Sequence, residues 1–208
     1  MAAKEIWITI PKRRPFKNVY QLKITLRGIE PQIWRRILVP ESYTFYDLHV
    51  AIQDAMGWED YHLHRFEIRD DKAPGERIII ETPFTEPEVE EEKFMSTEVP
   101  ISLYLQKPGD KVLYVYDYGD DWWHDVVLEK IEPRKPKKKY PLCLDGERAC
   151  PPEDCGGVPG YYRCLRAFRN KDNSEGLLSW LGDWNPDKFD PAQVRFESPK
   201  KRFEDRFL

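Results

Sequence analysis

Alternating apolar and polar positions predict a β-hairpin near the start of the chain. From Tyr20 to Arg27 every second residue is apolar, which is the pattern of a strand with one buried face. A turn over Gly28 to Pro31 separates this run from Ile33 to Val39, whose apolar residues also share a face. We therefore expect two neighbouring antiparallel strands.

Helical spacing follows the hairpin. Thr44 precedes Phe45, and Asp47 stands at the third helical position, which is the arrangement of a short capping box. Apolar residues then recur every three or four positions until Gly57, where the pattern ends. This predicts an amphipathic helix of about three turns.

The chain then returns to strand patterns. His62 to Ile68 alternates, and Arg77 to Ile80 is a short apolar strand candidate. Residues 81–98, by contrast, carry acids and prolines with few large apolar side chains, which indicates an exposed acidic insertion. Val112 to Tyr118 and Trp122 to Ile131 form a strong hairpin pattern around an acidic turn.

This element order predicts an α+β fold of the β-grasp, or ubiquitin-like, type, with a mixed sheet and one main packed helix. The alternative is another α+β sandwich, in which helices cover one face of a mixed sheet, because sequence alone does not fix strand order.

We expect an N-terminal extension over residues 1–19 and the β-grasp-like core over residues 20–132. Residues 133–208 then hold a Cys/Pro/Gly-rich segment and short helices, Tyr161 to Phe168 and Glu175 to Leu181, docked on that core. The short link between the two regions predicts one compact body.

Composition narrows the class of protein. Of 208 residues, 40% are hydrophobic, which is enough to bury a substantial core. No apolar run approaches the roughly 20 residues of a membrane helix, and the start of the chain lacks a signal-peptide pattern, so we expect a cytoplasmic protein without membrane contacts.

The net charge of −4 argues against a general nucleic-acid surface. A local basic run is the exception, and it is interpreted as a solvated linker or, alternatively, as a set of phosphate contacts. It contains Arg134, Lys135, Lys137, Lys138 and Lys139.

A rigid acidic segment lies between residues 142 and 161. Two adjacent prolines fix their own φ angles, and a Gly-Gly pair allows backbone conformations that other residues avoid. We therefore expect Glu153 and Asp154 to be held in a defined position. The Pro-Pro-Glu-Asp sequence also fits the start of a helical turn. The functional alternative is that these acids line a cleft that binds a cation or a basic peptide.

Histidines and aspartates give further candidates. His62 and His64 are expected on one strand face, either as partly buried hydrogen-bonded imidazoles or as a metal pair with a third ligand. A two-residue loop at Asp120 and the residue after it would place Asp117 across from His124, and another loop length would break that pair. In the simpler interpretation, Asp120 only caps the turn.

Four cysteines follow the spacing C-x6-C-x4-C-x8-C. Zinc sites usually have closer pairs, so Cys143, Cys150 and Cys155 are weak zinc candidates and packed thiols are the favoured interpretation. Neighbouring acids disfavour a catalytic thiolate. Tryptophans mostly lie in apolar patterns, and the common nucleotide and hydrolase motifs are absent, so we expect core packing and no cofactor.

Four ordered blocks, G-I-E-P-Q-I-W-R-R, G-W-E-D-Y-H-L-H-R-F-E-I, Y-D-Y-G-D-D-W-W-H and C-P-P-E-D-C-G-G-V-P-G-Y, resemble the Orf-three-like family named from a root-inducing plasmid. The resemblance runs from about residue 20 into the C-terminal region. It implies an α+β domain of bacteria and archaea, sometimes described as a passenger protein of transposable elements, and it supplies no catalytic residues.

Three functions remain open at this point. The leading hypothesis is a non-enzymatic binding or accessory protein that acts through contacts with a partner protein, because no catalytic set is complete. The second is a metal-assisted hydrolase with His62, His64, Asp117 and His124 as ligands or acid–base groups. The third is a DNA-binding role linked to mobile elements.

Overall fold

The computed structural model describes residues 9–69, 77–82 and 93–208. Within these residues, eight strands form one sheet in the order β5-β4-β3-β6-β7-β1-β2-β8. Neighbouring strands are antiparallel except for the parallel pair β4 and β5, so the sheet is mixed. The strands are β1 (Asn18–Leu26), β2 (Trp34–Pro40), β3 (His64–Arg69), β4 (Arg77–Glu81), β5 (Lys93–Met95), β6 (Lys111–Tyr116), β7 (Trp122–Pro133) and β8 (Leu142–Glu147).

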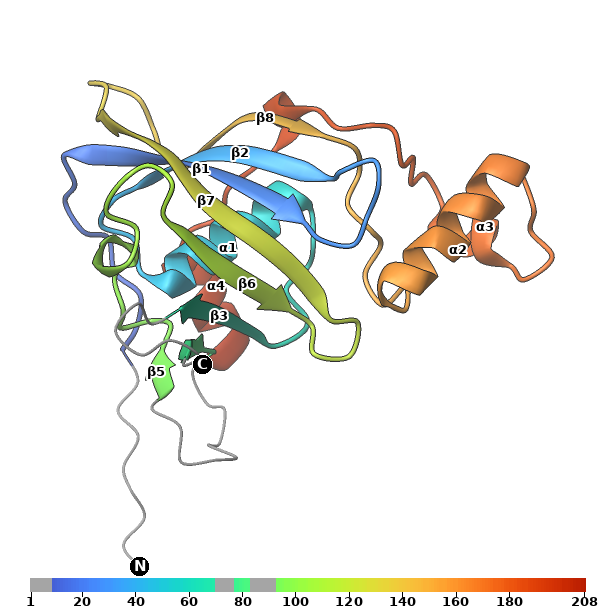
Figure 1. The fold of residues 1–208 in the computed structure, drawn as a ribbon, viewed down its shortest axis with the longest axis horizontal. Coiled ribbons are helices and arrows are strands. Elements are labelled where there is room, and N and C mark those ends of the chain that lie inside the picture. Colours follow the sequence, from blue (N-terminus) through green and yellow to red (C-terminus); the bar gives the residue numbers. More distant parts are fainter. Residues whose placement is uncertain (1–8, 70–76, 83–92) are drawn as a thin grey trace, which may run out of the picture.

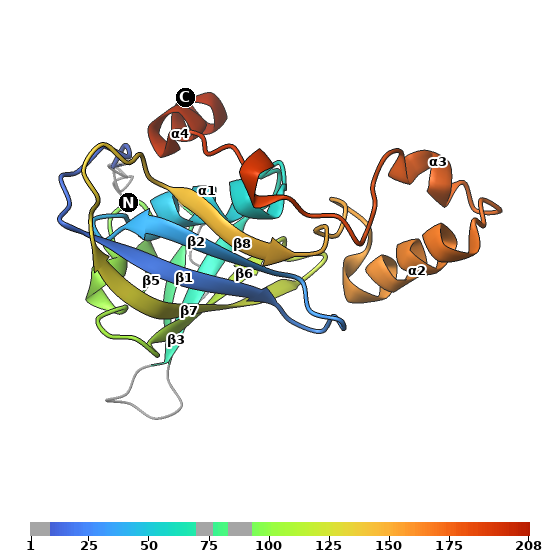
Figure 2. The ribbon, with the colours of Figure 1, turned by 90° about the horizontal axis from the view of Figure 1, so that it is seen from above.

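Helices cover one face of this sheet and one of its ends. Figure 1 and Figure 2 show α1 against the sheet, α4 on the outer side of α1, and α2 with α3 beyond one end of the strands. The α-helices are α1 (Phe45–Met56), α2 (Gly157–Asn170), α3 (Leu177–Leu181) and α4 (Pro199–Phe207); η1 (Ile101–Leu103) and η2 (Pro191–Gln193) are short 3-10 turns. No helix in the described part of the chain is long and apolar enough to span a membrane.

The predicted capping of α1 is confirmed. The Thr44 side chain accepts a hydrogen bond from the Asp47 amide, and the Asp47 carboxylate accepts one from the Thr44 amide. Gly57 ends the helix with a left-handed φ of 93°, a conformation that glycine adopts without steric cost. Both ends of the helix are therefore fixed by local sequence.

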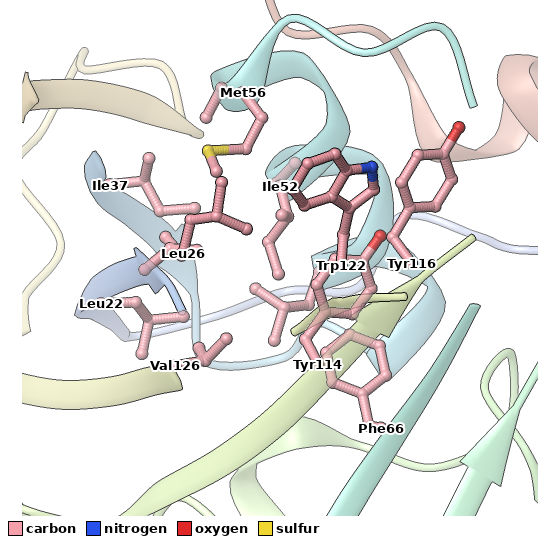
Figure 3. Packing of buried hydrophobic residues seen from close by; sticks show 14 of the residues in the cluster. Leu22, Leu26, Ile37, Ile52, Met56, Phe66, Tyr114, Tyr116, Trp122 and Val126 are labelled. Carbon is pink, nitrogen blue, oxygen red and sulfur yellow. The ribbon is translucent and has the colours of Figure 1, made fainter. Parts of the chain in front are cut away.

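The main core lies between the sheet and α1. Leu22 and Val126 from the strands meet Ile52 and Met56 from the helix, as Figure 3 shows. On the other side of α1, Tyr46 and Val50 pack against Phe203 of α4. Because α4 covers this outer side, almost every residue of α1 is buried rather than one stripe alone.

The α+β class with a mixed sheet is confirmed, whereas the β-grasp subtype is not. The elements that were not predicted are strand β8 at one sheet edge, strand β5 at the other, the 3-10 turn η1 and helix α4. The prediction that residues 81–98 form an exposed insertion is wrong at both ends: Glu81 is buried in β4, and Ser96 and Thr97 are fully buried beside β5. The middle of that stretch lies outside the described residues.

The Pro-Pro-Glu-Asp segment does not begin a helix. Glu153 and Asp154 form a turn, and α2 starts only at Gly157, after Gly156 in the left-handed region. Core packing of the tryptophans holds for Trp58 and Trp122, which are buried, but Trp180 on α3 is 51% exposed.

Candidate functional site

A cleft of about 1020 Å³ lies where the C-terminal region meets the end of α1. Its walls come from segments that are far apart in sequence. These are residues 54–59, 149–154, 187–190 and 193–195, together with Arg35, Trp180 and Trp184. The Cys/Pro/Gly-rich segment identified in the sequence therefore forms one wall of this cleft.

Carboxylates gather at the end of the cleft nearest the sheet. Glu153 Oε1 accepts hydrogen bonds from the Glu59 amide at 2.8 Å and from the Tyr116 hydroxyl at 3.0 Å. Burial raises the pKa of Glu153 above its ordinary value. Glu59 and Asp154 lie at the same end of the cleft and are exposed to solvent.

Aromatic side chains make up much of the remaining wall. The Trp58 indole donates a hydrogen bond to the Pro151 carbonyl at 3.0 Å, and the Trp184 indole donates one to the Cys150 carbonyl at 2.8 Å. These two tryptophans fix the position of the segment that carries Glu153. Trp180 makes no such attachment among the described residues and leaves half of its surface free.

A second group of polar side chains lies beside this acidic end. His62 Nε2 is 2.9 Å from Asp154 Oδ1 and 3.6 Å from Asp117 Oδ2. Among the described residues, these three side chains are the one group of histidine, cysteine and acidic residues spaced so that they could hold a metal ion. The predicted candidates His62, Asp117 and Asp154 are thus brought together.

The segment that carries Asp154 is tied to the turn that carries Asp117. Asp120 Oδ2 accepts a hydrogen bond from the Gly156 amide at 3.0 Å. A Cβ atom on Gly157 would lie 2.6 Å from the Asp120 carbonyl oxygen, and one on Gly160 would lie 1.7 Å from the Cys155 carbonyl oxygen. The glycines of this motif therefore permit backbone approaches that no other residue allows.

His64 does not join this group, although it was predicted on the same face as His62. Strand β3 begins at His64, whose ring is buried and stacks on His49 with 3.5 Å between ring centroids. Its Nδ1 is hydrogen-bonded to Thr82 Oγ1 at 3.0 Å. Burial lowers the pKa of His64 well below its ordinary value, so the ring is neutral.

The expected pair of Asp117 and His124 is wrong. Tyr116 pairs with Trp122, so the turn contains five residues instead of two, and His124 lies opposite Tyr114. His124 is completely buried, and burial lowers its pKa to about 3. It is a neutral core residue without access to the cleft.

The sequence interpretation missed a buried ionic network around Asp60. His49 Nε2 lies 2.9 Å from Asp60 Oδ1, and its Nδ1 lies 2.8 Å from the Tyr114 hydroxyl. From α4, Arg206 and Arg202 approach the same carboxylate at 3.0 and 3.6 Å. No periodic pattern indicated α4, so nothing in the sequence predicted that these arginines would meet Asp60.

The cysteine candidates do not assemble. All four thiols are free, and burial raises the pKa of Cys150 and Cys164, and that of Cys155 to about 12. Within the described chain, neither Cys143, Cys150 nor Cys155 belongs to a group with metal-ligand spacing. These residues act as packed thiols here.

The basic run forms the exposed loop between β7 and β8. Arg134 lies 5.1 Å above the Phe16 ring, and none of the five basic side chains lines the cleft. Any phosphate contacts made by this loop would be separate from the acidic end of the cavity.

Comparisons with known proteins identify the family. Residues 18–193 match the family described as Plasmid pRiA4b ORF-3-like protein. A Sinorhizobium fredii protein, described as uncharacterized protein y4hQ, is 31% identical over 193 residues, covering 90% of this chain and 92% of that protein. The crystal structure of MM3350, a protein of unknown function from Methanosarcina mazei Go1, is similar with a TM-score of 0.78 and 45% identity, covering 88% of this chain and 99% of that one. With most of its length matched in both sequence and fold, the chain belongs to the plasmid pRiA4b ORF-3-like family.

Proposed function

We propose that the protein is a non-enzymatic binding module whose cleft accepts a basic segment of a partner protein. A cleft of about 1020 Å³ that opens to solvent has room for several side chains of a peptide. Its walls combine carboxylates with indole rings, which are the two kinds of group that attract lysine and arginine side chains.

The charge of the acidic end supports a cationic ligand. Among the described residues, Glu59, Glu153 and Asp154 form no ion pair with a lysine or arginine of this chain. Two other carboxylates of the cleft are already neutralised: Asp54 pairs with Arg202 at 2.7 Å and Asp187 with Arg148 at 2.8 Å. A ligand with basic side chains would supply the missing partners at this end.

The half-exposed indole of Trp180 is the observation that carries the proposal. Trp58 and Trp184 also line the cleft, but their indoles are hydrogen-bonded to the segment that carries Glu153, whereas the Trp180 indole makes no such bond among the described residues. Large aromatic side chains on a cavity wall are the residues that most often dominate the binding energy of protein contacts. Trp180 therefore has the position of an anchor for the ligand.

A peptide titration tests this function. Tryptophan fluorescence is followed while the protein is titrated with a Lys/Arg-rich peptide, and an acidic peptide of equal length serves as the ligand control. We expect saturable binding of the basic peptide alone, weakened about tenfold or more by Trp180→Ala. Glu59→Gln should also weaken binding, by an amount that grows as the salt concentration falls.

Two matched variants show whether these losses are local. Leu103→Ala removes another exposed apolar side chain, and Glu175→Gln removes another exposed acid, and neither residue lines the cleft. Both should bind as the unaltered protein does. Equal binding of acidic and basic peptides, or full affinity in Trp180→Ala, would contradict the proposal.

The two alternatives receive less support. The hydrolase needed His62, His64, Asp117 and His124 in one cleft, and two of these histidines are buried in the core. The mobile-element role predicts that the protein binds duplex DNA with a steep salt dependence. That binding should be lost when Lys137, Lys138 and Lys139 are neutralised.

A further inference from the structure

We infer that His62, Asp117 and Asp154 form a binding site for one divalent transition metal ion of the zinc class. The three side chains come from separate segments: the loop before β3, the turn after β6 and the segment before α2. One imidazole and two carboxylates are a donor set that such ions accept. This site goes beyond the proposed peptide binding and does not depend on it.

The distances fit a single ion. His62 Nε2 lies 2.9 Å from the Asp154 carboxylate and 3.6 Å from that of Asp117. One donor atom from each of the three side chains lies within 4.8 Å of the other two. Zinc binds nitrogen and oxygen at about 2.0–2.2 Å, so its tetrahedral ligands are about 3.4 Å from each other. Small rotations of the exposed Asp154 side chain are enough to reach that arrangement.

One carboxylate oxygen of Asp117 is directed toward the other proposed donors. The residue is only 6% exposed, and its Oδ1 accepts a hydrogen bond from the Gly119 amide at 2.8 Å. Its Oδ2 receives no hydrogen bond from any described residue and faces His62 instead. This oxygen is not fully buried, so a cation can reach it beside His62 and would supply the partner that the described residues do not.

The surrounding contacts hold the three donors in position. Asp120 binds the Gly156 amide and so joins the turn of Asp117 to the segment of Asp154. Arg206 Nη2 donates to the His62 carbonyl at 3.2 Å and fixes the loop of the imidazole. Such outer contacts orient metal ligands in known sites.

The number and type of donors decide the kind of metal. Three protein donors are too few for Ca²⁺, which takes 6–8 oxygen ligands, and imidazole favours zinc-like ions over Mg²⁺. Because the His62 and Asp154 side chains are 31% and 66% exposed, the remaining coordination position faces solvent. The site therefore has the open form, with room for water or an external ligand.

Calorimetric titration with zinc chloride alone tests the inference. The protein is purified without a metal-affinity tag, dialysed against chelator and then against chelator-free buffer, and no peptide is present, so failure here is separate from failure of peptide binding. We expect one equivalent of zinc to bind, and Asp117→Asn and Asp154→Asn each to weaken it by at least about 100-fold. Asp120→Asn, which alters only a positioning residue, should weaken it by about tenfold.

Asp121→Asn is the matched control. It lies in the same turn, has the same φ of 57° as Asp117 and is exposed, but it is not a donor, so its zinc affinity should be unchanged. If Asp117→Asn does not fold, Asp154→Asn decides alone, because that side chain is on the surface. Unchanged affinity in Asp154→Asn, or zinc binding that is lost in Cys150→Ser instead, would overturn the inference.

Discussion

Replacing Asp60 with asparagine is expected to lower the free energy of unfolding by about 3 kcal/mol. The carboxylate is 2% exposed and contacts His49, Arg206 and Arg202. Burial alone would raise the pKa of Asp60, but these three neighbours hold it below its ordinary value. The neutral amide would leave the two arginines near a buried position without their shared counter-charge, and it would loosen the attachment of α4.

Urea unfolding at neutral pH measures this effect. Asparagine also tolerates the φ of 60° at this position, so the change removes charge without straining the backbone. Asp121→Asn, with the same chemical change at an exposed site of similar φ, should stay within about 0.5 kcal/mol of the unaltered protein. An Asp60 variant as stable as this control would show that the network contributes nothing.

Stability is expected to fall steeply as the pH decreases from 7 to 5. Burial lowers the pKa of His64 well below its ordinary value, and that of His124 to about 3. The unfolded chain therefore binds these two protons below about pH 6.5, whereas the folded chain does not. Above that pH both states are unprotonated at these rings, and the full stability is present. At pH 5, protonation of each histidine in the unfolded chain should have lowered the free energy of unfolding by about 2 kcal/mol.

Unfolding free energies at several pH values test this dependence. In His124→Gln the slope below pH 6 should decrease by about 1.4 kcal/mol per pH unit, because one proton fewer is taken up on unfolding. His62→Gln is the comparison variant, since it makes the same chemical change at a histidine that is 31% exposed instead of completely buried. The raised pKa of buried Asp54 acts in the opposite direction and contributes to the slope of every variant. The test is therefore the difference in slope between His124→Gln and His62→Gln. Equal slopes would contradict the expectation.

Local patterns predicted the elements whose signals are local. The capping residues and Gly57 defined α1, and alternation defined β1, β2, β6 and β7 to within a few residues. Strand β8 was not predicted because it is a half-exposed edge strand that contains a glycine, so its sequence shows no apolar face. Helix α4 escaped because only Phe203 is buried, so no apolar stripe appears.

The site was predicted in part for the same reason. Histidines and acids near turns and near the Pro/Gly-rich segment were the predicted site residues. The structure places five of them at the cleft or beside it, namely His62, Asp117, Asp120, Glu153 and Asp154. The failures concern long-range geometry. The five-residue turn shifted His124 into the core, and the stacking of His64 on a helix residue required the packing of α1 on the sheet.

Hydrogen exchange with and without a bound basic peptide tests the proposed binding cleft most directly. We expect slower exchange in residues 54–59, 149–154 and 180–195 when the peptide is bound, and no change in the basic loop at residues 134–139. Protection confined to the edge strands β5 or β8, or no protection at saturating peptide, would show that the partner does not occupy this cleft.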